Sequence, residues 1–135
     1  MKFLLEIITP ERQAFAKEVE NLTVPTSNGM IGVLSHHIPL FSALTEGEVK
    51  ITSENKEYFL AIGGGFMEVT PSRVSILVSR AMHADELNES EIKRAQEAAK
   101  TILAAKAKGD ERSAAQAVLH RSILELKVLG RRHSS

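Results

Sequence analysis

Two adjacent histidines, His36 and His37, are the side chains of this chain best suited to bind a metal ion. Neighbouring residues of an extended segment point to opposite faces, so one ion cannot easily contact both imidazoles. The sequence contains no cysteine, and no acidic cluster beside the pair completes a coordination shell. We therefore expect a structural or interface role for these histidines, and no metal site.

A run of three glycines, Gly63 to Gly65, has the composition of a phosphate-binding loop. No Lys-Ser or Lys-Thr pair follows it and no helix is expected to open after it, so the context of such a loop is missing. The spacing of serine, histidine and aspartate also gives no nucleophile with a base and an orienting group, which a hydrolase needs. We expect these glycines to allow close approach of strands or of a partner backbone, and we expect no catalytic residues.

Composition excludes further classes of function. The 17 basic and 17 acidic residues balance, which argues against attraction of the whole chain to nucleic acid or anionic lipid. One tyrosine and no tryptophan provide few stacking platforms for single-stranded nucleic acid. No apolar stretch could span a bilayer, and Glu6 and Pro10 interrupt the apolar start that a signal peptide would need. We expect a chain that is soluble by itself, with no nucleic-acid partner and no membrane span.

The first part of the chain consists of short apolar segments separated by turns, which predicts an antiparallel β-sandwich or barrel. Its central stretch, residues 24–40, combines the turn Ser27-Asn28-Gly29, an apolar strand over 30–34 and a proline at Pro39. Gly32 in that strand is expected to let another backbone approach closely. Strands are also expected over 3–9, 15–24, 48–52, 58–62, 66–69 and 73–78.

From Asp85 onward the composition changes to alanine, lysine, arginine and glutamate, which predicts two helices over 89–106 and 111–129. Asn88 and Glu91 have the spacing of a capping box, and Gly109 and Asp110 are expected to end the first helix and cap the second. The chain thus divides into a sandwich domain over 1–84 and an antiparallel helical hairpin over 85–135. The expected buried stripes are Ile92, Ala95, Ala99, Ile102 and Leu103 in the first helix, and Ala115, Val118, Leu119, Ser122, Leu126 and Leu129 in the second.

The hairpin has two features that bear on function. Alanines in the seam between the two helices bury little surface, so we expect the helices to pack weakly. A partner that binds the open hairpin more strongly could then separate them. The final part of the hairpin is basic, because five cations from Arg112 onward face one acid, Glu125. These cations can be explained as a solvated face whose charges stabilise the dipole at the helix C-terminus. They can equally be explained as a surface that docks to an acidic segment of a partner.

Taken together, the motifs resemble the epsilon subunit of bacterial rotary ATP synthase, a family that includes chloroplast epsilon and mitochondrial delta subunits. The resemblance covers nearly the whole chain. It implies a β-sandwich of about ten strands followed by a two-helix hairpin. The matching motifs, in order, are Gly29-x-x-Gly32-Val33-Leu34-x-x-His37-x-Pro39-Leu40, Leu44-x-x-Gly47-x-Val49-x-Ile51, Gly64-Gly65-Phe66-x-Glu68-Val69, Val74-x-Ile76-Leu77-Val78 and Ala84-Asp85-Glu86-Leu87.

The resemblance also implies a role and partners. The chain would be a non-catalytic rotor subunit of a proton- or sodium-translocating F-type synthase, peripheral at the cytoplasmic face of the bacterial membrane. With the gamma subunit it would join the alpha/beta catalytic head to the c-ring and restrain ATP hydrolysis through its helices. A free-standing β-sandwich binding module is the alternative.

Residues implied in c-ring and gamma contact lie at one end of the sandwich in relatives. Some relatives have an acid at Met30, and the family pattern Pro-Gly-His reads Ser35-His36-His37 here, so this loop departs from the pattern. The matching residues are Asn28, Gly29, Met30, Ile31, His37, Pro39 and Leu40.

A regulatory ATP site is implied more weakly, and the role requires no cofactor. Relatives that bind ATP share an aliphatic-Asp-x-x-Arg-Ala motif, which reads here as Ser90-Glu91-x-x-Arg94-Ala95, with Arg121 as the basic residue of the second helix. Glu125 falls where some ATP binders have arginine, and its charge would repel phosphates. A capped helix start with an Arg94 ion pair explains the first motif equally well. The basic face that would meet the catalytic head comprises Arg121, Lys127, Arg131 and Arg132.

Overall fold

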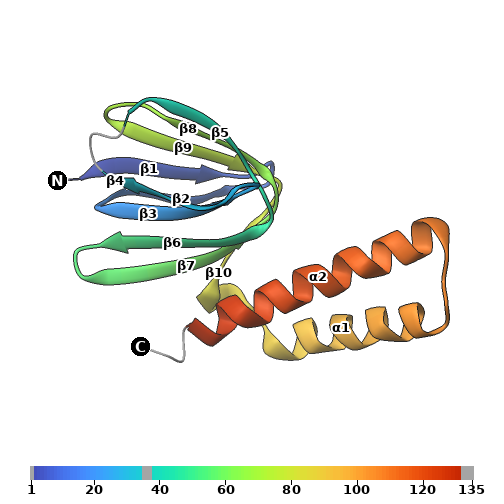
Figure 1. Ribbon diagram of the computed structural model, residues 1–135. Coiled ribbons are helices and arrows are strands. Elements are labelled where there is room, and N and C mark those ends of the chain that lie inside the picture. The colour runs from blue at the N-terminus through green and yellow to red at the C-terminus, as the bar shows by residue number, and fades with distance from the viewer. Residues whose placement is uncertain (1, 35–37, 132–135) are drawn as a thin grey trace. The chain divides into compact units, whose positions relative to one another are not determined.

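The computed structural model describes residues 2–34 and 38–131 of the chain. The chain divides into two compact units, Met1–His83 and Ala84–Ser135, and each is described by itself. The first is a β-sandwich and the second an antiparallel helical hairpin, which confirms the fold expected from the sequence (Figure 1).

Ten strands of the first unit form two five-stranded sheets (Figure 1). One sheet has the order β2-β1-β9-β8-β5 and the other β10-β7-β6-β3-β4. The strands are β1 (Phe3–Ile8), β2 (Gln13–Val19), β3 (Asn21–Thr26), β4 (Gly29–Leu34), β5 (Leu40–Leu44), β6 (Gly47–Ser53), β7 (Lys56–Ile62), β8 (Gly65–Val69), β9 (Arg73–Val78) and β10 (Ala81–His83).

Two details of the sandwich differ from the sequence expectation. The segment 15–24 is not one strand, because the chain passes at Glu20 from β2 in one sheet to β3 in the other. The Glu20 backbone N–H donates to the Thr52 carbonyl over 2.8 Å, so the crossing keeps this donor paired. The pairing of β1 with β9 is parallel, an exception within an otherwise antiparallel sandwich.

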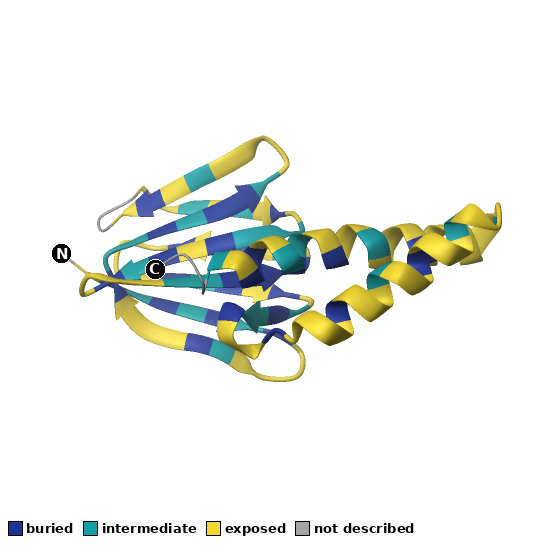
Figure 2. Ribbon diagram, turned by 90° about the horizontal axis from the view of Figure 1, so that it is seen from below, coloured by how far each residue is buried: buried dark blue, intermediate teal, exposed yellow. Residues whose placement is uncertain are grey.

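The core lies between the sheets and follows the period-two alternation of the strands (Figure 2). In β1, for example, Phe3, Leu5 and Ile7 are buried while the residues between them are half-buried. Each large aliphatic side chain buried in this way contributes about 1.5–3 kcal/mol. The largest fully buried side chains of the sandwich are Leu5, Ile7, Leu22, Ile51, Leu60, Ile62, Met67, Ile76, Val19, Val24 and Val33.

The glycine run 63–65 leads directly into β8, and its last member allows two strands to approach. A Cβ at Gly65 would lie 2.7 Å from the Cα of Val78 and would also run into the Leu77 carbonyl group. The expected close approach of strands is thus confirmed at Gly65. The same expectation is wrong for Gly32, where the nearest atom to a Cβ would be the Leu22 carbonyl oxygen at 3.9 Å, an ordinary contact.

The second unit begins with a short 3-10 helix, η1 (Ala84–Glu86), followed by α1 (Glu89–Ala104) and α2 (Gly109–Arg131). Asn88 is the N-cap of α1, as expected, since its side-chain oxygen accepts the Glu91 backbone N–H over 3.1 Å. Helix α1 ends before residue 106, because Lys106 has a left-handed φ of 60° and donates its N–H to the Leu103 carbonyl.

The expected boundary between the helices is wrong. Gly109 begins α2 instead of ending α1, and Asp110 lies in the first turn of α2 instead of capping it. Lys106 takes the left-handed position that ends α1, and Gly109, at the start of α2, is also left-handed with a φ of 64°. The acidic side chain of Asp110 still stabilises α2, because a negative charge in the first turn opposes the helix dipole.

The buried stripes of the hairpin are also narrower than expected. In α1 Ile92 and Ala99 are buried and Leu103 is half-buried, whereas Ala95 and Ile102 are exposed. Gln96 takes the half-buried position between them, so the stripe follows the spacing 92, 96, 99 and 103. In α2 the expected Val118 is exposed, Leu119 and Leu126 are half-buried, and the buried residues are Ala115, Ser122, Glu125, Val128 and Leu129.

Candidate interaction surfaces

The turn between β3 and β4 presents the first part of the predicted contact segment. Gly29 has a φ of 104°, and Thr26 holds the turn by donating its hydroxyl to the Gly29 carbonyl over 2.6 Å. Asn28 and Met30 are exposed, whereas Ile31 is half-buried and packs against the core. The turn therefore projects an amide and a flexible apolar side chain from a fixed backbone.

The second part of the predicted segment, Pro39 and Leu40, lies at the opposite end of the sandwich (Figure 1). The Thr45 N–H donates to the Pro25 carbonyl over 3.1 Å, so the last residues of β5 adjoin the β3–β4 turn and its first residue, Leu40, is remote from it. The expectation of one shared contact end is therefore wrong. His37 lies outside the described residues, as does the neighbouring His36.

The outer face of the first sheet carries an apolar surface that the sequence interpretation missed. Phe41 in β5, Phe66 in β8 and Leu77 in β9 are 68%, 52% and 52% exposed. Phe66 pairs with Leu77 in the register, and its ring stacks on Phe41 with centroids 5.6 Å apart. We call Phe41, Phe66 and Leu77 the apolar band.

Neighbours in the register extend the apolar band across the sheet. Ala43 pairs with Phe66 on one side, and Ile8 pairs with Leu77 on the other. Large apolar side chains gathered on a solvated face are typical of an interaction site. The signal was present in the sequence, because Leu77 is apolar at the outward position between the buried Ile76 and Val78, where a polar side chain is usual.

The residues of the implied nucleotide site all lie in the hairpin. Glu91 and Arg94 are exposed in the first turns of α1, and the antiparallel course of the helices brings Arg121 to their level. The ion pair at the start of α1 joins Lys93 to Glu89 over 3.7 Å, and not Arg94 to Glu91.

Arg121 already has an acidic partner one turn further along α2. Its Nε lies 3.5 Å from Oε2 of Glu125, and Glu125 is only 7% exposed. A buried carboxylate of this kind needs a cation nearby. The burial of Glu125 depends on how the two helices pack, and the sequence did not predict it.

The predicted basic face is divided by the same pair. Lys127 and Arg131 are four residues apart and therefore lie on one face of α2. Arg121 is displaced from that face and is paired with Glu125. Arg132 lies outside the described residues.

The fold and these surfaces define a class of protein: a β-sandwich with an exposed apolar band, joined to a helical hairpin. The family model described as the ATP synthase delta/epsilon chain, beta-sandwich domain, matches residues 2–84. The chain belongs to the ATP synthase epsilon chain family.

Bacterial relatives support this membership over almost the full length. The ATP synthase epsilon chain of Dehalococcoides mccartyi is 36% identical over 132 residues, which are 97% of this chain and 94% of the relative. Those of Syntrophobacter fumaroxidans and Chloroflexus aggregans are 39% and 34% identical, over 94% and 95% of this chain and 95% and 92% of the relatives.

Solved structures show the same fold. A chain in the Euglena gracilis mitochondrial ATP synthase, in a structure of OSCP, F1 and c-ring, has a TM-score of 0.69 at 20% identity, covering 98% of this chain and 80% of that one. A chain in the central stalk and c-ring structure of the Tetrahymena thermophila mitochondrial enzyme has a TM-score of 0.60 at 16% identity, covering 96% and 97%.

In residues 2–34 and 38–131, no helix has the length and apolar character needed to cross a membrane. Over the same ranges, no three or more His, Asp or Glu side chains are grouped so that they could hold a metal ion.

Proposed function

We propose that this chain is a non-catalytic rotor subunit of an F-type ATP synthase. Its sandwich would bind the neighbouring rotor subunits, and its hairpin would regulate ATP hydrolysis. Membership of the epsilon chain family supports the role. The observation that carries it is the apolar band, because a solvated sheet face with two stacked phenylalanines is suited to permanent attachment to another subunit.

The gamma subunit is the proposed partner of the apolar band. Phe41 follows Leu40 at the start of β5, so the apolar band begins next to the implied contact segment, although Leu40 itself packs against the core. We assign the opposite end, the turn with Asn28, Gly29 and Met30, to the c-ring. A chain fixed at both places would join gamma to the ring and lie peripherally at the cytoplasmic face of the bacterial membrane.

The hairpin is the proposed regulatory part. Its α1 contributes Ala99 and the half-buried Gln96 to the seam, where larger apolar side chains would bury more surface. The two helices therefore close weakly, and an opened hairpin could bring Lys127 and Arg131 to acidic residues of the alpha/beta head. Contact there would obstruct rotation and restrain ATP hydrolysis.

We propose no cofactor and no regulatory nucleotide site for this chain. Arg121, the basic residue that would face a phosphate, is paired with the buried carboxylate of Glu125. A nucleotide would have to displace that carboxylate or lie beside its negative charge, and both cost free energy.

Removing the basic face is expected to weaken inhibition about tenfold without preventing assembly. Exposed ion pairs contribute about 0.2–1 kcal/mol each, and several together amount to about 1.4 kcal/mol. The variant has alanine at Lys127, Arg131 and Arg132 and keeps Arg121, because loss of Arg121 would leave the buried Glu125 carboxylate unpaired. The measurement is the concentration of the chain that halves ATP hydrolysis by the catalytic core.

A control variant loses the same number of charges elsewhere in the hairpin. It has alanine at three exposed lysines of α1 and the connecting loop, Lys93, Lys100 and Lys108. Equal inhibition by the two variants would contradict the proposed role of the basic face. No observation favours the alternative of a free-standing binding module.

A further inference from the structure

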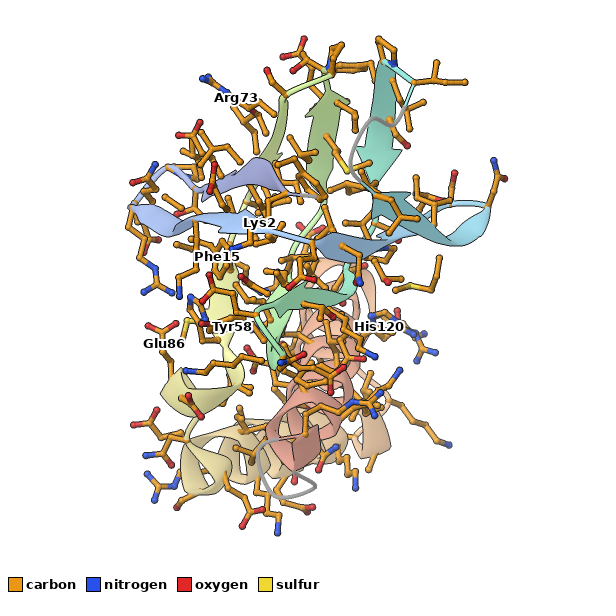
Figure 3. All side chains as sticks on the ribbon, turned by 90° about the vertical axis from the view of Figure 1, so that its left-hand side faces the viewer. Lys2, Phe15, Tyr58, Arg73, Glu86 and His120 are labelled. Atoms are coloured by element: carbon orange, nitrogen blue, oxygen red, sulfur yellow. The ribbon has the colours of Figure 1, made fainter. Side chains whose placement is uncertain are left out.

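An aromatic cluster lies at the edge of the sandwich where β2, β7 and β10 meet. The Tyr58 ring stands edge-on to the Phe15 ring, with centroids 5.4 Å apart and an interplanar angle of 73° (Figure 3). Phe15 in turn lies 6.2 Å from the His83 ring, and Nε2 of His83 is hydrogen-bonded to the Ala14 carbonyl over 2.6 Å. Tyr58 is therefore held from one side by packed rings.

Two lysines lie against the same phenol. Lys17 donates from Nζ to the Tyr58 hydroxyl oxygen over 2.9 Å, and its Nζ is 5.2 Å from the ring centroid. Lys56, at the start of β7, places its Nζ 5.1 Å from the centroid. Both charged side chains on the ring are cations, so they favour the phenolate over the neutral phenol.

The electrostatics agree with this geometry. The hydrogen bond from Lys17 lowers the pKa of Tyr58 below its ordinary value, and the charges of Lys17 and Lys56 act in the same direction. Burial opposes the shift, but Tyr58 is only half-buried, so its oxygen can be reached by a small molecule. A fixed, reachable phenol beside two ammonium groups has the features of an activated nucleophile.

We propose that Tyr58 is a site of covalent modification by small activated acyl donors. The phenol gives up its proton, and the phenolate oxygen attacks the acyl carbon and forms the ester bond. The bond from that carbon to the leaving group breaks, and the leaving group takes the electron pair and a proton. Lys17 keeps its charge and holds the attacking oxygen. The inference rests on the sandwich alone and is independent of the proposed function.

The test is acetylation of the full chain by N-acetylimidazole, with N-acetyltyrosinamide as the reference phenol. Tyr58 is the only tyrosine and there is no tryptophan, so loss of phenol absorbance reports on this residue alone. We expect acetylation several-fold faster than that of the reference at neutral pH, with a rate profile displaced to lower pH. Hydroxylamine should reverse it, because it cleaves a phenyl ester and leaves a lysine amide intact.

Variants show whether fast acetylation of Tyr58 is due to Lys17 or only to the exposure of the phenol. Lys17→Gln should slow acetylation several-fold, towards the reference rate, and Lys17→Arg should restore most of it. Lys50→Gln is the matched control, since Lys50 pairs with Glu57 over 2.9 Å and pairs in the register with Phe59, on the sheet face opposite to Tyr58. The proposal would be overturned if Tyr58 in the native chain were acetylated no faster than N-acetyltyrosinamide. It would also be overturned if a lysine were acetylated faster than Tyr58, or if Lys17→Gln left the rate unchanged.

Discussion

Replacing Phe41 and Phe66 by alanine is expected to lower the affinity of the chain for the gamma subunit by about a thousandfold. Aromatic side chains at the centre of an interface typically cost at least about 2 kcal/mol each when truncated, and about 4 kcal/mol is a thousandfold in affinity. Both rings are more than half exposed in the free chain, so their removal should leave its stability almost unchanged. The measurement is the dissociation constant for purified gamma subunit.

The matched control removes two other exposed apolar side chains of the sandwich. Met30 and Leu34 lie on β4 of the second sheet, away from the apolar band, and alanine there should leave gamma binding intact. If the control variant lost affinity and the Phe41 and Phe66 variant did not, the proposed gamma surface would be refuted.

Gly65→Ala is expected to lower the free energy of unfolding by about 3 kcal/mol, the upper end of the range for overpacking. The added Cβ would lie 2.7 Å from the Cα of Val78 and would meet the Leu77 carbonyl, so backbone and not a flexible side chain must move. Moving it separates β8 from β9 in the middle of the sheet. Chemical denaturation of the purified variant measures the loss.

Gly32→Ala provides the comparison within the same domain. A Cβ at Gly32 would make an ordinary contact with the Leu22 carbonyl, and alanine reduces the entropy of the unfolded chain. We expect stability to be unchanged or slightly raised. Equal destabilisation by the two substitutions would show that glycine is required at both positions and that the strand approach at Gly65 is not the cause.

The sequence predicted the sandwich and the hairpin because both depend on local patterns. Alternating apolar residues and the Asn88 cap are local signals, and the structure confirms them. The crossing between sheets at Glu20 and the parallel pairing of β1 with β9 depend on contacts between distant segments. No local pattern encodes those contacts, and Lys106 replaces glycine at a position where glycine is only preferred.

The candidate surfaces were less predictable for the same reason. The sequence predicts one contact segment over 28–40, but the length of β4 separates its two halves. The apolar band joins β5, β8 and β9, which are remote in sequence, and the buried Glu125 depends on helix packing. Of these, only the apolar side chain at the outward position of Leu77 could have been found in the sequence.

The most direct test of the account is the rate of ATP hydrolysis by the matching catalytic core, stripped of this subunit and supplied with one of two chains. One is the full chain and the other ends at Ala84, which keeps the compact sandwich and removes the hairpin. The account predicts that both bind and that only the full chain slows hydrolysis. Inhibition of equal strength by the truncated chain would contradict the regulatory role of the hairpin, and failure of both to bind would contradict the stalk role.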